Sequence, residues 1–285
     1  MREVGRLFHS VDELQQRLAG ARYVADDGLC TALFLAARLP QPLLLEGEAG
    51  VGKSELPRTL AEAYGLPFIR LQCYEGLDSR DALYEWNYMQ QLVEIKLHEG
   101  LSVTDLFTPR FLNPRPLLKA LQSAPAVLLI DEVDRADEAF EAFLLEFLAD
   151  YAITIPELGT VRAAVPPVVV LTSNRTRELH DALKRRCLYH WVEYPSLEQE
   201  QRIVAARAPE VDPALTEAVV RAVRWLRSMD LQKPPGIAET LAWARAAQLL
   251  GAEGRSVLME TLGVVLKNYD DIQRVRERGL EGLGS

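Results

Sequence analysis

The stretch LLLEGEAGVGKS, residues Leu43–Ser54, decides the fold of this chain. It begins with a short apolar run that is typical of a buried strand, and it continues into a glycine-rich loop that ends in Gly-Lys-Ser. A helical pattern follows the loop to about Tyr64. The loop matches the spacing G-x-x-x-x-G-K-[ST], and a strand before it and a helix after it are the setting in which this spacing predicts a phosphate-binding loop.

Each part of this loop suits a nucleotide. Glycines let the backbone form a concave nest of N–H groups, and the N-terminus of the next helix adds a partial positive charge. Lys53 is expected to reach the β- and γ-phosphates, and the Ser54 hydroxyl is expected to bind Mg²⁺. A glycine-rich turn with an incidental lysine is the alternative, which the flanking strand and helix disfavour. The predicted nucleotide contacts here are Gly47, Glu48, Ala49, Gly50, Val51, Gly52, Lys53, Ser54 and Glu55.

A second apolar strand ends in two acidic residues. The run Val127–Ile130 leads directly into Asp131 and Glu132, and ligands of such sheets bind at the carboxyl ends of the strands. Asp131 is expected to hold Mg²⁺ through a water molecule, beside Ser54, and Glu132 is expected to orient and deprotonate the attacking water. A pair of solvated acids is the alternative. Together with the phosphate loop, the pair predicts an enzyme that binds Mg-ATP and hydrolyses it to ADP and phosphate.

Two further motifs extend this predicted site. Asn174 follows the apolar strand Val168–Thr172, where its amide could bond the γ-phosphate or the attacking water, although a turn residue is the common alternative for asparagine. The basic cluster at 184–186 would ordinarily be a solvated surface. In a ring-forming ATPase, an arginine here reaches the neighbouring subunit's γ-phosphate. Arg186 is the first choice for this role, and Arg185 is the second.

The composition is that of an ordinary globular chain. The 285 residues are 48% hydrophobic and 26% charged, and a net charge of −9 argues against a nucleic-acid partner. No apolar run of about 18 residues predicts a membrane span, and the first residues lack the apolar core of a signal peptide. Three widely spaced cysteines argue against disulfides and for the cytoplasm. Cys187 and His190 form a single C-x-x-H, which is expected to be a chance pairing rather than a zinc site.

Apolar strands alternate with helical patterns up to Pro195, which predicts an α/β fold with a parallel sheet covered on both faces. A hairpin is expected from Ala152 to Val161. Residues 80–106 fit either a hairpin or an inserted helix, and residues 113–116 are predicted to be a turn. The predicted strands of the sheet are 43–46, 67–71, 126–130, 168–172 and 189–194.

The composition changes after Pro195. From Leu197 to about Asn268 only helical patterns occur, separated by prolines and glycines, and residues 270–285 are expected to fray. The expected domains are therefore residues 1–195, which carry the motifs, and residues 196–285, which form a small helical domain.

In this order, the motifs resemble those of the AAA+ ATPases. The sequence of the segments around these motifs is similar to that of the MoxR family, and within it to the CoxD-like subgroup, over about residues 20–268. The segments that carry the resemblance are GEAGVGKSEL, LLIDEVDRADEAFEAFLLEFLAD, ITIPELGTVRA and VVVLTSNRTRELHDALKRRCLYHWVEYPSLEQE.

The resemblance implies a fold and a function. The fold is an αβα core whose five-stranded parallel sheet has the strand order 5-1-4-3-2, with a helix-2 insertion near 85–100, a pre-sensor-1 hairpin near 151–166 and a C-terminal α-helical lid. The implied assembly is a hexameric ring. The implied function is that of a chaperone-like ATPase that matures or activates a metalloenzyme complex with a von Willebrand factor A (VWA) domain protein. CoxD is linked to the molybdenum-copper site of carbon monoxide dehydrogenase, so a molybdenum hydroxylase is the implied kind of client.

Two features depart from the family's pattern. A sensor-2 arginine is common early in a lid helix, whereas Pro235–Thr240 carries an acid there. Arg245 or Lys233 could substitute, so the sensor-2 role is left unassigned. Pro57, early in the helix after the phosphate loop, would crowd the Lys53 carbonyl and leave it without an N–H partner, which predicts a kink.

Other assignments stay open at this point. Tyr23 and Val24 lie where AAA+ proteins often contact adenine, and ordinary packing at a helix start is an equal alternative. Gln72, which ends the second strand, could restrain Glu132 when no partner is bound. Two other functions compete with remodelling. One is a nucleotide-switched binding scaffold with little turnover, and the other is an AAA+ nucleic-acid motor, against which the negative net charge and the missing helix-turn-helix and zinc finger count.

Overall fold

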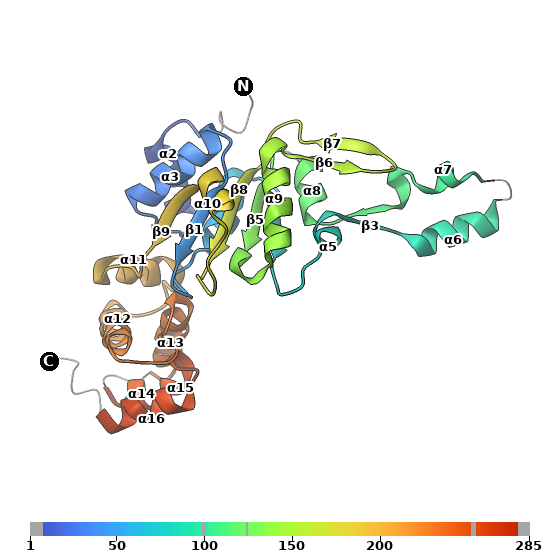
Figure 1. Ribbon diagram of the computed structural model, residues 1–285. Coiled ribbons are helices and arrows are strands. Elements are labelled where there is room, and N and C mark those ends of the chain that lie inside the picture. Colours follow the sequence, from blue (N-terminus) through green and yellow to red (C-terminus); the bar gives the residue numbers. More distant parts are fainter. Residues whose placement is uncertain (1–7, 99–100, 124, 252–254, 279–285) are drawn as a thin grey trace. The chain divides into compact units, whose positions relative to one another are not determined.

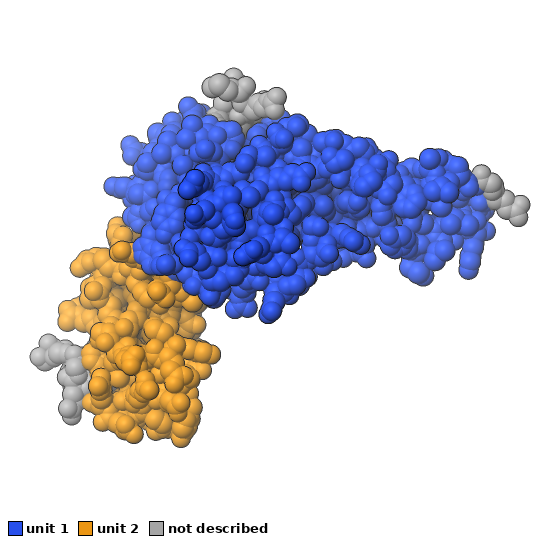
Figure 2. Space-filling model, in the orientation of Figure 1, with its two compact units in different colours: residues 1–21, 25–47, 54–191 blue, residues 22–24, 48–53, 192–285 orange. Residues whose placement is uncertain are grey.

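The structure is a computed structural model that describes residues 8–98, 101–123, 125–251 and 255–278 (Figure 1). The start of the chain, where no signal peptide is expected, and residues 279–285 of the expected fraying tail lie outside these ranges. Two compact units make up the chain (Figure 2). The first contains residues 1–21, 25–47 and 54–191, and the second contains residues 22–24, 48–53 and 192–285.

A five-stranded sheet lies at the centre of the first unit. The three strands β1, β5 and β8 are buried along their whole length, as expected of central strands covered on both faces. The registers that join β1 to β8, β8 to β5 and β5 to β2 are parallel, which confirms the predicted class of fold. The strands are β1 (Leu43–Gly47), β2 (Phe68–Gln72), β5 (Val127–Asp131), β8 (Val168–Ser173) and β9 (Leu188–Val192).

The strands of this sheet stand in the order β2-β5-β8-β1-β9. These labels run differently from the expected numbering because β3, β4, β6 and β7 belong to two separate two-stranded sheets. Counted along the chain within the five-stranded sheet alone, the order is 2-3-4-1-5, or 5-1-4-3-2 from the opposite edge. As a consequence, β5 has β2 on one side and β8 on the other, so residues far apart in the chain meet at the carboxyl end of β5.

Helices of the first unit begin where the sequence supplies caps. The side chains of Ser10, Asp26 and Asp137 each accept a hydrogen bond from the N–H group three residues on. Apolar residues on one face of α9, such as Phe140 and Phe147, are buried in the core beside the sheet. The helices are α2 (Val11–Gly20), α3 (Asp27–Arg38), α4 (Glu55–Tyr64), α8 (Pro116–Gln122), α9 (Glu138–Asp150) and α10 (Asp181–Arg186).

The segment that fitted either a hairpin or a helix contains both. The strands β3 (Tyr84–Trp86) and β4 (Leu112–Pro114) pair antiparallel, and the helices α6 (Tyr88–Leu97) and α7 (Val103–Leu106) lie between them in the chain. Figure 1 shows this insertion as an arm that leaves the body of the first unit. The short helix α5 (Ser79–Leu83) precedes the arm, and a 3₁₀ turn, η1 (Pro109–Phe111), returns from it.

The turn predicted at residues 113–116 is wrong. Asn113 and Pro114 are in β4, opposite Glu85 and Tyr84, and α8 starts at Pro116. Proline suits both places, because an edge strand and the first position of a helix do not need its missing N–H. The predicted hairpin is confirmed, as β6 (Ala152–Ile155) and β7 (Gly159–Arg162) pair antiparallel.

The second unit is helical in its described residues beyond Val192. Its core gathers buried apolar side chains, with Val204, Val223 and Trp243 fully buried. The helices are α11 (Leu197–Arg207), α12 (Pro213–Ser228), α13 (Ile237–Leu249), α14 (Arg255–Glu260), α15 (Leu262–Val265) and α16 (Tyr269–Arg278).

The expected fraying from residue 270 onward is wrong for the described part of that segment. Asp271 and Val275 in α16 are both fully buried. The Asp271 carboxylate accepts hydrogen bonds from the backbone N–H groups of Gln232 and Lys233, each at 3.0 Å. A polar sequence therefore forms a packed helix because its buried carboxylate satisfies the loop before α13.

Asp271→Ala is expected to lower the free energy of unfolding of this unit by about 2–3 kcal/mol, because two backbone N–H groups would lose a charged acceptor. Urea denaturation followed by circular dichroism measures the change. Asp270→Ala is the matched control, since Asp270 lies in the same helical turn and is exposed. Equal effects of the two substitutions would contradict the role given to the Asp271 carboxylate.

Candidate active site

The predicted metal ligands are in direct contact. Asp131, the last residue of β5, has 2% of its surface exposed. Its Oδ1 accepts a hydrogen bond of 2.7 Å from the Oγ of Ser54, the residue before α4, and another of 2.5 Å from the Oγ1 of Thr172 on β8. The order of β5 and β8 in the sheet thus places a carboxylate between two hydroxyl groups from distant parts of the chain.

Glu132 contacts Gln72, the partner that the sequence suggested, and also Asn174 and Arg135. Its Oε2 accepts a hydrogen bond of 3.0 Å from Nε2 of Gln72, and its Oε1 lies 3.4 Å from Nδ2 of Asn174. Arg135 also contacts Oε2, at 3.0 Å. The backbone of Glu132 is left-handed, with φ of 54°, and its N–H donates to Thr172 Oγ1 at 2.9 Å. A non-glycine residue in this conformation carries strain, which is frequent at functional sites.

The position of Asn174 depends on Asp134, which sequence reasoning missed. The buried Asp134 carboxylate accepts hydrogen bonds from the N–H groups of Asn174, at 3.2 Å, and Thr176, at 2.8 Å, and from the Thr176 hydroxyl at 2.7 Å. The spacing of Asp131 and Asp134 was the available signal, since a second acid three residues after the first reaches the loop beyond β8.

Arg70 was also missed. It lies two residues before Gln72 on β2, so both side chains are on the same face of that strand. Its Nε and Nη2 lie 2.9 and 2.5 Å from Oδ2 of Asp131, and Nη2 also donates to Oε1 of Gln72. The signal in the sequence was the charged residue in a strand that borders β5, but the pairing of these strands is not local.

Cys73 lies next to these acids and is not a nucleophile. It follows Gln72, and its N–H donates to the carbonyl oxygen of Asp131 at 2.9 Å. Burial, helped by the negative charge of Asp131, raises the pKa of the Cys73 thiol to about 12. The thiol therefore stays protonated at neutral pH.

The phosphate loop, residues 48–53, belongs to the second compact unit, together with Tyr23 and Val24. Lys53 is 5% exposed, and its Nζ donates to the carbonyl oxygen of Glu48 at 2.7 Å. Gly50 and Gly52 have φ of +82° and +94°, a conformation that favours glycine and lets the loop curl around its own N–H groups. Gly47 ends β1, and Glu55 is the first residue of α4.

The loop contacts the first turn of α13 inside the second unit. The N–H of Ile237 donates to the carbonyl oxygen of Gly50 at 2.9 Å. A Cβ atom on Gly236 would lie 2.6 Å from Gly50 Cα and 2.8 Å from Gly50 O, so this approach requires glycine. Glu239, the acid found in place of a sensor-2 arginine, accepts a hydrogen bond from Gly236 N at 3.0 Å and so satisfies one N–H group at the start of α13.

Neither proposed sensor-2 substitute points to a nucleotide role. Arg245 contacts Glu210 Oε1 at 2.9 Å and donates to the carbonyl oxygen of Arg207 at 2.6 Å. Lys233 is exposed, and its N–H is one of the two that Asp271 accepts. The sensor-2 role therefore stays unassigned.

The hydrogen bond that Pro57 was predicted to remove does not exist. The helix α4 begins at Glu55, so Pro57 is its third residue, where the N–H has no acceptor inside any α-helix. Because Lys53 precedes the helix, its carbonyl oxygen is not one of those that accept a hydrogen bond within α4. Proline is tolerated in this first turn.

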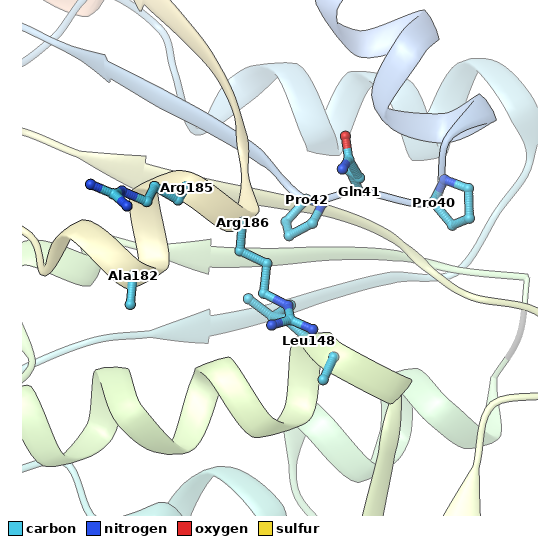
Figure 3. Close-up of a pocket in the computed structure, with 8 residues that line it drawn as sticks. Pro40, Gln41, Pro42, Leu148, Ala182, Arg185 and Arg186 are labelled. Atoms are coloured by element: carbon cyan, nitrogen blue, oxygen red, sulfur yellow. The ribbon is translucent and has the colours of Figure 1, made fainter.

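The two arginines predicted to act in trans lie at the end of α10. Both line a pocket of about 410 Å³ together with residues 40–42 and the end of α9 (Figure 3). In Figure 3 the Arg186 side chain points toward Leu148, whereas the Arg185 side chain points away from it. Within the described residues, no ion pair joins either arginine to Asp131 or Glu132, and both arginines are exposed.

A parallel sheet with a phosphate loop after its first strand and an acidic pair after a central strand characterises P-loop proteins. Residues 42–187, more than half of the chain, match the family described as AAA domain (dynein-related subfamily), and the chain belongs to this AAA+ family of ATPases.

Relatives and a solved structure are similar over most of the chain. Gas vesicle ATPase GvpN of Haloferax mediterranei is 24% identical over 263 residues, which are 85% of this chain and 75% of that protein. Denitrification regulatory protein NirQ of Stutzerimonas stutzeri is 25% identical over 244 residues, 82% of this chain and 81% of that protein. A crystal structure from Cytophaga hutchinsonii matches 93% of this chain and 84% of that chain with a TM-score of 0.51 at 17% identity, a likeness of fold alone.

Two kinds of feature are missing from the residues that the structure describes. None of the helices that the structure describes is both long and apolar enough to cross a membrane. In the same residues, no three or more His, Cys, Asp and Glu side chains gather in a group that could hold a metal ion by themselves. A magnesium site of the kind expected here does not need such a group, since phosphates and water supply most of its ligands.

Proposed function

We propose that this protein is a Mg-ATP-hydrolysing, chaperone-like AAA+ enzyme that remodels a partner protein. The observation that carries the proposal is the buried Asp131 carboxylate in contact with the Ser54 hydroxyl, directly before Glu132. In this proposal residues 1–195 are the ATPase core and residues 196–285 are its helical lid.

The side chains present fit the metal that the family implies. Ser54 and Asp131 offer a hydroxyl and a carboxylate oxygen 2.7 Å apart, which are the oxygen donors that Mg²⁺ prefers. These two residues would hold the ion beside the phosphate loop. When bound, Mg²⁺ supplies positive charge to the β- and γ-phosphate oxygens.

The protein's own residues bind the nucleotide and activate the attacking water. Lys53 neutralises phosphate charge, and the loop N–H groups from Gly47 to Glu55 hold the phosphates. Glu132 takes a proton from the attacking water, and Asn174, whose amide lies 3.4 Å from Glu132, orients that water or the γ-phosphate. Tyr23 and Val24 are the proposed adenine contacts.

Hydrolysis would require a second subunit. Arg186, or Arg185 as the second choice, would stabilise charge on the γ-phosphate held by a neighbouring copy in a hexameric ring. The exposure of both side chains at the end of α10 supports this assignment, since an arginine that acts in trans must extend from the surface of its own subunit into the neighbouring one.

The arm offers a surface for the partner. Residues along α6 keep apolar side chains exposed, by 46% for Ile95 up to 72% for Met89. A helix with exposed apolar residues on its surface is typical of a protein contact site. The exposed apolar residues of α6 are Tyr88, Met89, Leu92, Val93, Ile95 and Leu97.

The client that we propose follows from the likeness to the CoxD-like MoxR proteins. It is a metalloenzyme complex, such as a molybdenum hydroxylase of the carbon monoxide dehydrogenase type, approached together with a VWA-domain protein. The relatives support an ATP-driven regulatory role, because GvpN is named as an ATPase and NirQ as a regulatory protein.

Gly236→Ala is expected to weaken nucleotide binding at least about tenfold, which corresponds to about 1.4 kcal/mol. The φ of Gly236 is −86°, which alanine adopts freely, so the effect would come from the new methyl group pushing on Gly50. Titration with a fluorescent ADP measures it. Gly263→Ala is the matched control, because a Cβ there meets nothing within 4 Å. An unchanged affinity would show that the contact with α13 does not shape the phosphate loop.

The proposed function is tested by ATP turnover over a range of protein concentrations, with Mg²⁺ and with EDTA. We expect phosphate release that needs Mg²⁺. The rate per subunit should rise steeply over the range of protein concentration in which the ring forms. Tight ATP binding with negligible turnover at concentrations where the ring is present would contradict the proposal and favour a nucleotide-switched scaffold.

A further inference from the structure

We propose that Arg70 competes with the metal ion for Asp131: its guanidinium neutralises this carboxylate in the nucleotide-free protein and leaves when Mg-nucleotide binds. The inference rests on the proposed function, because that function makes Asp131 a metal ligand. It concerns a residue of β2 for which the proposed hydrolysis mechanism has no use.

The hydrogen bonds of Asp131 leave no room for a metal ion. Its Oδ1 accepts from Ser54 at 2.7 Å and from Thr172 at 2.5 Å. Its Oδ2 accepts from Arg70 Nε at 2.9 Å and from Arg70 Nη2 at 2.5 Å. A carboxylate offers about four lone-pair sites, and here each of them has a donor. A metal ion, or a water molecule bound to it, can contact this carboxylate only after one of the donors has left.

Arg70 is the donor that can leave. Thr172 is 1% exposed and fixed within the central strand β8, and Ser54 is itself the second proposed metal ligand. The Arg70 side chain is 46% exposed, and both of its hydrogen bonds to Asp131 are made to Oδ2. A guanidinium and a divalent cation on the same oxygen would also repel each other.

The same contact explains how the protein tolerates Asp131 without a metal. Asp131 is 2% exposed, and a buried carboxylate without a counter-charge is strongly destabilising. Among the described residues, Arg70 is the cation that forms an ion pair with it. Arg70 therefore supplies the charge that Mg²⁺ supplies in the loaded state.

Release of Arg70 would also reach Glu132 through Gln72. The Gln72 amide accepts from Arg70 Nη2 with its Oε1 and donates to Glu132 Oε2 with its Nε2, at 3.0 Å. When Arg70 leaves Asp131, Gln72 loses a partner that fixes its orientation, and its hold on Glu132 weakens. Metal binding at one acid is thereby linked to the freedom of the other.

The experiment compares the affinities for fluorescent ADP with Mg²⁺ and with EDTA in Arg70→Ala and in the unaltered protein. We expect Arg70→Ala to tighten binding of Mg-ADP at least about tenfold, with ADP in EDTA changed by less than about twofold. The melting temperature of the nucleotide-free protein should fall and should recover when Mg-ADP is added. Arg70→Gln, which keeps a neutral donor near Asp131, is expected to fall between the two proteins and serves if Arg70→Ala does not fold.

Arg58→Ala is the matched control. Arg58 is an exposed cation on α4 that lies over the ring of Phe68, the first residue of β2, and it should leave both affinities unchanged. Mg-ADP affinity that is unchanged in Arg70→Ala would overturn the inference, as would equal weakening with Mg²⁺ and with EDTA, which would place Arg70 on the phosphates. If the unaltered protein binds ADP no better with Mg²⁺ than with EDTA, the metal assignment in the proposed function fails instead.

Discussion

Glu132→Gln is expected to lower kcat for ATP hydrolysis by about 10²–10⁴-fold, the usual contribution of a general base. The amide keeps the size of the side chain, and its single oxygen can still accept from Gln72 or from Asn174, but it cannot take a proton from water. Because Glu132 does not contact the phosphate loop in the proposed mechanism, affinity for Mg-ADP should change by less than about twofold. Phosphate release at saturating ATP and a fluorescent-ADP titration measure the two quantities.

Glu138→Gln is the matched control for this substitution. Glu138 is an exposed acid in the first turn of α9, a few residues beyond Glu132, and its loss should leave turnover unchanged. Turnover of Glu132→Gln at the rate of the unaltered protein would show that another group activates the water. A parallel loss of Mg-ADP affinity would show that Glu132 holds the nucleotide rather than the water.

The strand ends of the site could be predicted from the sequence because each signal is local. A run such as Val127–Ile130 shows where a buried strand stops, and the next residues then lie at the carboxyl edge of the sheet. The same argument placed Asn174 after β8. That Asp131 lies between hydroxyl groups of Ser54 and Thr172 follows once β8 stands beside β5.

The contacts that could not be predicted join segments far apart in the chain. Nothing in the sequence near Arg70 shows that its strand borders β5, so its ion pair with Asp131 could not be predicted from the sequence. The approach of Gly50 to Gly236 is of the same kind, since each glycine by itself fits an ordinary turn. The packing of helix α16 was missed for another reason. Its sequence is polar, and nothing in that sequence shows that one of its carboxylates, Asp271, is buried and accepts hydrogen bonds from backbone N–H groups.

Arg186→Ala is expected to lower kcat by about 10³–10⁵-fold if its guanidinium completes the neighbour's site, as arginine fingers do in other nucleotide hydrolases. Binding of Mg-ADP should be retained, because ADP lacks the γ-phosphate that the arginine would contact. Arg185→Ala distinguishes the two candidates, since Figure 3 shows their side chains pointing in different directions. A larger loss in Arg185→Ala than in Arg186→Ala would assign the role to Arg185.

Mixed rings test whether Arg186 acts in trans. Glu132→Gln and Arg186→Ala are each expected to be nearly inactive alone. In rings co-assembled from equal amounts of both, an interface is intact when Glu132 comes from one variant and Arg186 from the other, as holds for about a quarter of random interfaces. Turnover should therefore recover to about a quarter of the activity of the unaltered protein. If both residues served the same subunit's nucleotide, no mixed ring would contain an intact site, and the mixture would stay as inactive as its components.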